Sequence, residues 1–227
     1  MSAPPAPIKN AATIILLRYL DGKPHVLMGQ RGKNASFMPD KFVFPGGAVD
    51  PTDVTTPLLR PINETCLARL ALTPREEDTG ASELGHALCV AAIRELWEET
   101  GLPLVADEQA PSDWHGLTLE GRPPTADGLR YVFRAITPPG RPRRFDARFF
   151  LADASSIPAD PDDFSNADDE LRHIHWVALD KARQLNLPFI TEVVLAEVSA
   201  LATLRGSPPS VPFFNNQDTQ SEFLRLV

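Results

Sequence analysis

The chain has 227 residues, of which 43% are hydrophobic and 23% are charged, and its formal net charge is −8. This composition is typical of a soluble globular protein and excludes general disorder, and the length suits one domain, 1–227, with an insertion. The negative charge argues against broad electrostatic binding to nucleic acid or to an anionic membrane. An anionic substrate would therefore need a local positive site.

The first residues and the cysteines give no sign of secretion. The opening "MSAPPAPIKN" lacks a basic stretch followed by a long apolar run, and the apolar run that comes next stops at Arg18. Two cysteines, Cys66 and Cys89, do not indicate a disulfide framework, and Cys89 falls within a helical pattern. We therefore expect a cytoplasmic protein without a membrane partner.

The first part of the chain is predicted to begin with a β-hairpin. Residues 11–20 and 25–31 are rich in strand formers and are separated by "DGKP", a typical turn sequence. A short strand, "FVFPGG" at 42–47, ends in two glycines that permit a tight turn. Pro, Thr and charged residues then dominate 51–83, which we expect to be an inserted segment with a short helix at 64–72.

The later part of the chain is predicted to contain two long helices and three strands. Apolar residues recur with helical spacing at 84–100 and at 189–204. Strand patterns lie between them, at 129–137, 147–153 and 172–179. We expect 206–227 to be a polar C-terminal tail. Hairpin strands with few helices suggest an α/β/α sandwich or an α+β fold.

The helix predicted at 84–100 ends in the acidic stretch "AIRELWEET". Side chains three and four residues apart share a helix face, so Glu95, Glu98 and Glu99 project together, and Arg94 can pair with Glu98. Three crowded carboxylates repel one another unless cations neutralise them, and Mg²⁺ or Mn²⁺ prefers such oxygen ligands. On this segment alone, a solvated helix face is the alternative.

The nine residues "RELWEETGL", 94–102, match one half of the Nudix signature, and "FPGGAVD", 44–50, resembles the strand and turn that begin it. The resemblance implies a Nudix-fold α/β/α sandwich with a mixed central sheet. The signature's upstream Gly and Glu would fall on Gly80 and His86. Because Gly80 follows no predicted strand, we place the start of the motif at Gly46 and Gly47, with 51–83 inserted inside it. The missing Glu is left unassigned, with Glu83 as one alternative.

This split motif resembles the branch of Nudix hydrolases that includes peroxisomal coenzyme A diphosphatases and their bacterial relatives, over roughly residues 10–205. That resemblance implies metal-dependent cleavage of a diphosphate linkage in a small nucleoside diphosphate derivative, with coenzyme A or acyl-coenzyme A leading. A stricter coenzyme A signature matches at Arg31 and departs at Ser36 and Asp40. The alternatives are therefore a dinucleotide or nucleotide-sugar, such as NADH or ADP-ribose, and a non-catalytic nucleotide-sensing module. The oligomeric state is open, with a homodimer as one alternative.

The resemblance also assigns roles to individual residues. The Mg²⁺ or Mn²⁺ ligands would be Glu95, Glu98, Glu99 and the Gly46 carbonyl. Arg94 would orient the glutamates, and Glu170, in the late acidic loop, is a candidate general base. The predicted substrate contacts are Arg31, Gly47, Arg141, Arg143 and Arg144. Guanidinium groups suit phosphate oxygens, although the cluster at 141–144 could instead pair with the acidic loop at 160–170.

Overall fold

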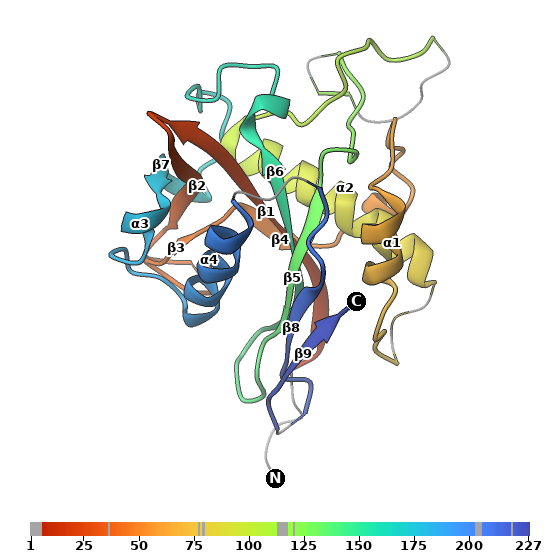
Figure 1. Ribbon diagram of the computed structural model, residues 1–227, viewed down its shortest axis with the longest axis vertical. Coiled ribbons are helices and arrows are strands. Elements are labelled where there is room, and N and C mark those ends of the chain that lie inside the picture. The colour runs from red at the N-terminus through yellow and green to blue at the C-terminus, as the bar shows by residue number, and fades with distance from the viewer. Residues whose placement is uncertain are drawn as a thin grey trace.

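The computed structural model describes residues 6–35, 37–76, 78, 80–112, 118–119, 121–202, 206–218 and 220–227. Ser36, at one of the positions that depart from the coenzyme A signature, lies outside these ranges. Within them, the strands form a single nine-stranded mixed sheet (Figure 1). The expected α/β fold with a mixed central sheet is confirmed.

The sheet has one continuous path of hydrogen-bonded strands and two strands that branch from it. The path runs β3 (Phe42–Val43), β2 (Lys23–Arg31), β1 (Ile8–Leu20), β6 (Arg144–Asp153), β5 (Arg130–Ile136), β8 (Val211–Asn215) and β9 (Glu222–Leu226). Two more strands pair outside this path, β4 (Gly46–Ala48) with β1 and β7 (Leu171–Ala178) with β2. The β1–β6 and β5–β8 pairs are parallel, and the other pairs are antiparallel.

Helices cover both faces of this sheet. They are α1 (Glu64–Leu70), α2 (Ala81–Thr100), α3 (Leu179–Ala182) and α4 (Phe189–Leu201), with short 3-10 turns η1 (Pro51–Val54) and η2 (Ala154–Ser156). Helices α2 and α4 lie on opposite faces of the sheet (Figure 1), and each packs over its own hydrophobic core. Because side chains alternate along a strand, neighbouring strand residues such as Ile14 and Ile15 enter different cores.

Helix α2 forms where the apolar spacing predicted it. Leu88, Ala92 and Leu96 are four residues apart and fully buried against the sheet. Gly101 ends the helix in the left-handed region, with φ at 73°, where a residue without a side chain is favoured. The helix begins at Ala81, slightly before the predicted start at 84.

The predicted hairpin is confirmed by the antiparallel pairing of β1 and β2, in register from Leu17 with Val26 to Leu20 with Lys23. Strand β1 begins at Ile8 because its first residues pair in parallel with β6. The short helix predicted inside the inserted segment is confirmed as α1. No helix among the described residues is both long enough and apolar enough to cross a membrane.

Two local predictions were wrong. The segment at 206–227 is not merely a polar tail, because β8 and β9 extend the sheet and bury Val211, Phe213 and Leu226. The parallel pairing of β8 with β5 depends on contacts between distant residues, which the local pattern does not reveal. The single strand predicted at 42–47 is divided into β3 and β4, which pair with different strands.

Candidate active site

The two glycines of the "FPGG" segment lie against the C-terminal half of α2. The backbone N–H of Gly46 donates a hydrogen bond of 2.8 Å to Glu99 Oε2. A methyl group on Gly47 would lie 2.3 Å from Glu95 Oε1, so only glycine lets this carboxylate approach the backbone so closely. The structure therefore brings the "FPGG" segment and the acidic end of α2 together, although the segment at 51–80 separates them in the sequence.

Arg94 gathers the acidic side chains of this region around its guanidinium group. It donates to Glu95 Oε1 at 2.8 Å and to Glu98 Oε2 at 3.1 Å, which includes the predicted pairing four residues apart. It also donates to the Ala48 carbonyl at 3.1 Å, so it holds β4 against α2. Because all these contacts come from one rigid group, Arg94 fixes the position of the two glutamates relative to the strand.

Asp53 is a further member of the site that the sequence analysis missed. Its carboxylate accepts two hydrogen bonds of 3.0 Å from Arg94, and its side chain is only 1% exposed. Hydrogen bonding to Asp53 is the largest cause that raises the pKa of Arg94, although burial opposes it. Asp53 also accepts from the Asp50 N–H in a capping box. The pattern "DPTD", an acidic cap before proline, was the signal that could have located this turn.

Glu99 is an unusual carboxylate because it is almost entirely buried, with 1% exposure. Burial raises its pKa well above the usual range, the Gly46 hydrogen bond lowers it, and the negative charges of Glu95 and Glu170 raise it further. No described residue donates a hydrogen bond to Glu99 Oε1. Burial also raises the pKa of Glu95, against the lowering effect of Arg94. The surroundings of both carboxyl groups therefore disfavour their charged forms.

The late acidic loop is docked beside α2. The Asp168 N–H donates to the Glu98 carbonyl at 2.8 Å, and a side chain on Gly101 would collide with Asn166. This contact places Glu170 near the motif, where its Oε1 accepts a hydrogen bond of 2.7 Å from Arg31. Arg31, the acidic end of α2 and Glu170 are distant in the sequence but lie close together in the fold.

His86 occupies the position of the missing signature Glu, and it faces the inserted segment. Its Nε2 lies 2.8 Å from the Thr56 carbonyl, within hydrogen-bonding distance. The alternative acid, Glu83, precedes Glu95 by twelve residues on the same helix. At about 1.5 Å of rise per residue, that separation is about 18 Å along α2. Glu83 therefore lies far from Glu95 along the helix.

No three His, Cys, Asp or Glu side chains in the described ranges are arranged as a ready metal site. Arg94 donates hydrogen bonds to Glu95 and Glu98, and Glu99 accepts a hydrogen bond from the Gly46 N–H. The chemistry of the donors nevertheless fits a hard divalent cation, because the group supplies carboxylate oxygens and leaves the buried Glu99 Oε1 without a hydrogen bond. The residues present are thus compatible with Mg²⁺ or Mn²⁺.

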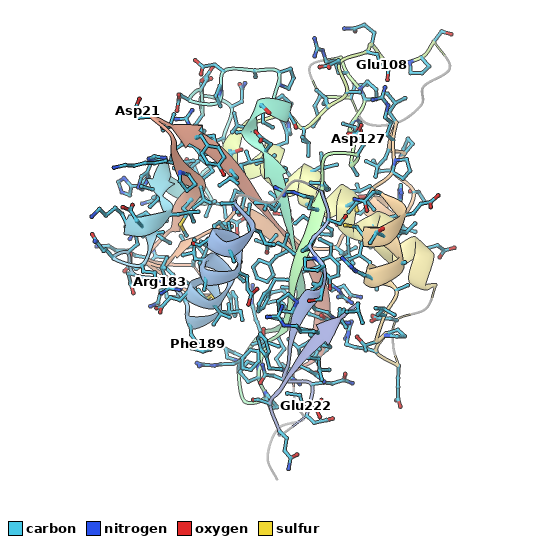
Figure 2. The ribbon with its side chains drawn as sticks, viewed as in Figure 1. Asp21, Glu108, Asp127, Arg183, Phe189 and Glu222 are labelled. Atoms are coloured by element: carbon cyan, nitrogen blue, oxygen red, sulfur yellow. The ribbon has the colours of Figure 1, made fainter. Side chains whose placement is uncertain are left out.

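A cavity of about 710 Å³ opens beside these carboxylates. Its lining includes the acids Glu95 and Glu170, the predicted metal ligand Gly46 and two of the predicted substrate contacts, Arg31 and Gly47. The view with side chains in Figure 2 shows Phe189, which also lines this cavity, near the lower end of α4. A ligand in this space would contact both the acidic centre and the sheet.

The three clustered arginines have different environments. Arg141 and Arg143 are exposed and line the cavity. Arg144 also reaches the lining, but it is buried and donates to the carbonyls of Thr137, Asn216 and Gln217. In the described part of the chain, no ion pair joins these arginines to the acidic loop at 160–170.

Comparisons with known proteins bear on this arrangement. No model of a protein family matches the chain. Over 166 residues it is 31% identical to nudix hydrolase 7 of Caenorhabditis elegans, a match that covers 66% of this chain and 46% of that protein. The chain thus spans about half the length of the curated relative it matches.

The solved structures include a Nudix hydrolase from Alicyclobacillus acidocaldarius that is 27% identical, with a TM-score of 0.61. That match covers 89% of this chain and 99% of the other. The chain has the Nudix fold. The MutT protein of Methanosarcina mazei Go1, at 15% identity and a TM-score of 0.50 over 88% of this chain and 98% of the other, agrees on the fold alone. The curated relative and the first structure together support a relationship of this chain to the Nudix hydrolase family.

Proposed function

We propose that this Nudix-fold chain is a metal-dependent hydrolase that cleaves a diphosphate linkage in a nucleoside diphosphate derivative. Coenzyme A or acyl-coenzyme A is the leading substrate. The observation that carries the proposal is the buried carboxylate of Glu99, which lies beside the charges of Glu95 and Glu170 and has one oxygen without a hydrogen bond. A buried acid so placed is costly unless a cation offsets its charge.

The residues that would hold Mg²⁺ or Mn²⁺ are Glu95, Glu98, Glu99 and the Gly46 carbonyl. When bound, the ion supplies positive charge to the diphosphate and lowers the pKa of the attacking water. The protein contributes the positions of these ligands. Arg94 holds Glu95 and Glu98, and the Gly46 N–H holds Glu99. Asp53 in turn fixes Arg94.

Proton transfer is assigned to Glu170, because it lines the cavity near Glu95 and Glu99. Its carboxylate would accept the proton of the attacking water, and the ion pair with Arg31 fixes its position. Arg31 would then also contact a substrate phosphate, and the side-chain-free backbone at Gly47 would allow close approach. Arg141, Arg143 and Arg144 stay proposed substrate contacts.

Turnover of a substrate panel tests this function. The panel contains coenzyme A, acetyl-coenzyme A, NADH, ADP-ribose and dinucleoside polyphosphates, each with Mg²⁺, with Mn²⁺ or with a chelator. We expect turnover that requires metal and disappears in Glu98→Gln, because the variant lacks a proposed metal ligand. The fold should stay intact, because the Glu98 side chain is 47% exposed. Glu64→Gln, an exposed change in the first turn of α1, is the matched control and should retain turnover.

The pattern of hydrolysis distinguishes the proposed functions. Preference for NADH or ADP-ribose would replace coenzyme A with a dinucleotide or nucleotide-sugar as substrate. If no compound is hydrolysed but one of them raises the melting temperature, the site binds a nucleotide without catalysis. That result would overturn the proposed hydrolase in favour of a nucleotide-sensing module.

A further inference from the structure

The cavity has a second end, which the proposed chemistry at the carboxylates does not use. The residues that line this second end include Lys9, Arg141 and Arg143. Among the described residues, the acids that line the cavity are Glu95 and Glu170. Both acids belong to the catalytic centre proposed above. In a chain of net charge −8, the other end of the cavity is therefore a local basic region, named here the basic end.

The strand registers place the basic end far from the carboxylates. Lys9 pairs with Phe145 across the β1–β6 interface, and Thr13 pairs with Gly46 across the β1–β4 interface. These two positions on β1 are four residues apart, which at about 3.3 Å per residue corresponds to about 13 Å along the strand. Figure 1 agrees, since the β5–β6 connection lies at the bottom of the view and β4 near its middle.

A single diphosphate is too short to span the backbone separation between these two positions on β1. Its two phosphorus atoms share one bridging oxygen, so the group is much shorter than the separation along β1. If the diphosphate lies at Glu95, Glu98 and Glu99, the basic end must contact a different part of the substrate. That part should carry negative charge, because the basic end offers an ammonium and two guanidinium groups.

The positive charges of the basic end are available to a ligand. Lys9, Arg141 and Arg143 are exposed, and none has a hydrogen bond or ion pair with another described residue. The other basic side chains of the cavity are engaged, Arg31 with Glu170 and Arg144 with three backbone carbonyls. Arg31 and Arg144 are thus held by other parts of the protein. The three basic groups of the basic end have no partner among the described residues.

An aromatic surface adjoins these charges. Phe37 and Phe145 line the cavity and meet edge to face, with ring centroids 5.1 Å apart. Phe145 is the strand partner of Lys9 and follows Arg143 by two residues. Aromatic faces suit the planar ring of a nucleobase, so the aromatic pair and the basic end together match a nucleoside that carries a phosphate.

We infer that the basic end binds a phosphomonoester that the substrate carries in addition to its diphosphate. The inference rests on the proposed function, and it narrows the substrate class to nucleoside diphosphate derivatives phosphorylated on the ribose. Lys9, Arg141 and Arg143 are the residues that select this class. They contact the phosphomonoester and take no part in cleavage at the carboxylate centre.

Two substrate pairs that differ only by the ribose phosphate test the inference. They are coenzyme A with 3′-dephospho-coenzyme A, and NADPH with NADH, each assayed for kcat/KM with Mg²⁺ and with Mn²⁺. The wild-type protein should favour the phosphorylated member of at least one pair by about tenfold or more, the size expected for charge-assisted contacts. The pair that shows the preference identifies which ribose position is recognised.

The variant Lys9→Gln/Arg141→Gln/Arg143→Gln should lose this preference. The ratio of its kcat/KM for the phosphorylated member to that for the other member should fall about tenfold or more. The matched control, Lys181→Gln/Arg183→Gln, removes two exposed charges at α3, where Figure 2 labels Arg183, and should change neither value. Equal loss for both members, or loss for neither, would overturn the inference.

A binding measurement separates failure of the inference from failure of the proposed function. If nothing in the panel is hydrolysed, the proposed hydrolase fails. Calorimetry without metal would then compare adenosine 3′,5′-bisphosphate and adenosine 2′,5′-bisphosphate with adenosine 5′-monophosphate, in the wild type and in the Lys9, Arg141 and Arg143 variant. Tighter binding of either bisphosphate that the variant loses would support the phosphomonoester site. Equal binding of all three compounds would overturn it.

Discussion

Arg94 and Asp53 form a two-pronged ion pair that joins α2 to the inserted segment, with Nε to Oδ1 and Nη2 to Oδ2 both at 3.0 Å. Asp53 is 1% exposed and lies in η1, so a residue between the "FPGG" segment and α2 positions Arg94. The segment at 51–83 is therefore part of the candidate site, through Asp53.

The first prediction is that Asp53→Asn lowers activity without preventing folding. The change keeps the shape of the side chain but removes the charge that pairs with Arg94, so the two glutamates held by Arg94 lose their fixed position. We expect kcat/KM to fall about 10- to 100-fold, as for residues that support metal ligands. Steady-state kinetics and circular dichroism would check this. Asp107→Asn, an exposed change in a loop, should retain activity.

The second prediction concerns the close contact between Gly47 and Glu95. In Gly47→Ala the new methyl group would lie 2.3 Å from Glu95 Oε1, so the carboxylate must move. We expect kcat/KM to fall about tenfold or more, because the displaced Glu95 carboxylate is a proposed metal ligand. The melting temperature should change little, because no residue of the hydrophobic core is displaced. Gly128→Ala, whose added carbon would meet Ser156 Oγ at 3.5 Å, is the control. Equal activity in both variants would contradict this assignment.

The third prediction separates function from stability at Glu99. Because burial raises the pKa of Glu99 well above its usual range, its charged form is costly in the folded protein. Glu99→Gln should therefore lower turnover by about a hundredfold or more while the melting temperature, measured in a chelator, stays equal or rises. A large fall in melting temperature together with unchanged turnover would show that Glu99 is structural.

The fourth prediction concerns pH and the buried ion pairs near β1. Burial raises the pKa of Asp78, but hydrogen bonds from Asn10 and the Arg75 N–H, together with the charges of Arg75 and Arg148, lower it more. Because the pKa of Asp78 is lower in the folded state, its charge stabilises the fold at pH values above the pKa of the unfolded state. This stability is lost as the pH falls through the pKa of the folded state. Asp78→Asn should cost on the order of 2 kcal/mol of unfolding free energy at pH 7.

Denaturant titrations of the wild type and Asp78→Asn at several pH values would check this. The difference in unfolding free energy should narrow as the pH falls below about 4, because Asp78 of the unfolded wild-type protein takes up a proton there while the folded carboxylate is still charged. Asp163→Asn, an exposed change, should show no comparable difference at pH 7. A difference that does not depend on pH would rule out the charge of Asp78 as its source.

Local features of the fold were accessible from the sequence. The turn "DGKP" and its flanking apolar residues predicted the β1–β2 hairpin, and the spacing of Leu88, Ala92 and Leu96 predicted α2. The addition of β8 and β9 to the sheet was not predicted, because β8 pairs with a strand that precedes it by more than seventy residues (Arg134 with Phe213). Periodicity within a segment shows which face is buried but does not name the partner strand.

The sequence by itself determined that Arg94 and its glutamates lie on one side of a helix. The spacing in "RELWEETGL" was enough to place Arg94 and its glutamates on one side of α2, since helix geometry depends only on positions three and four apart. The tertiary structure decided which groups meet this helix. Asp53 and Gly46 reach it from 41 and 53 residues away, and Glu170 reaches it through a loop docked on the Glu98 carbonyl. Such contacts form only when the strands pair and the core closes, so no local pattern specifies them.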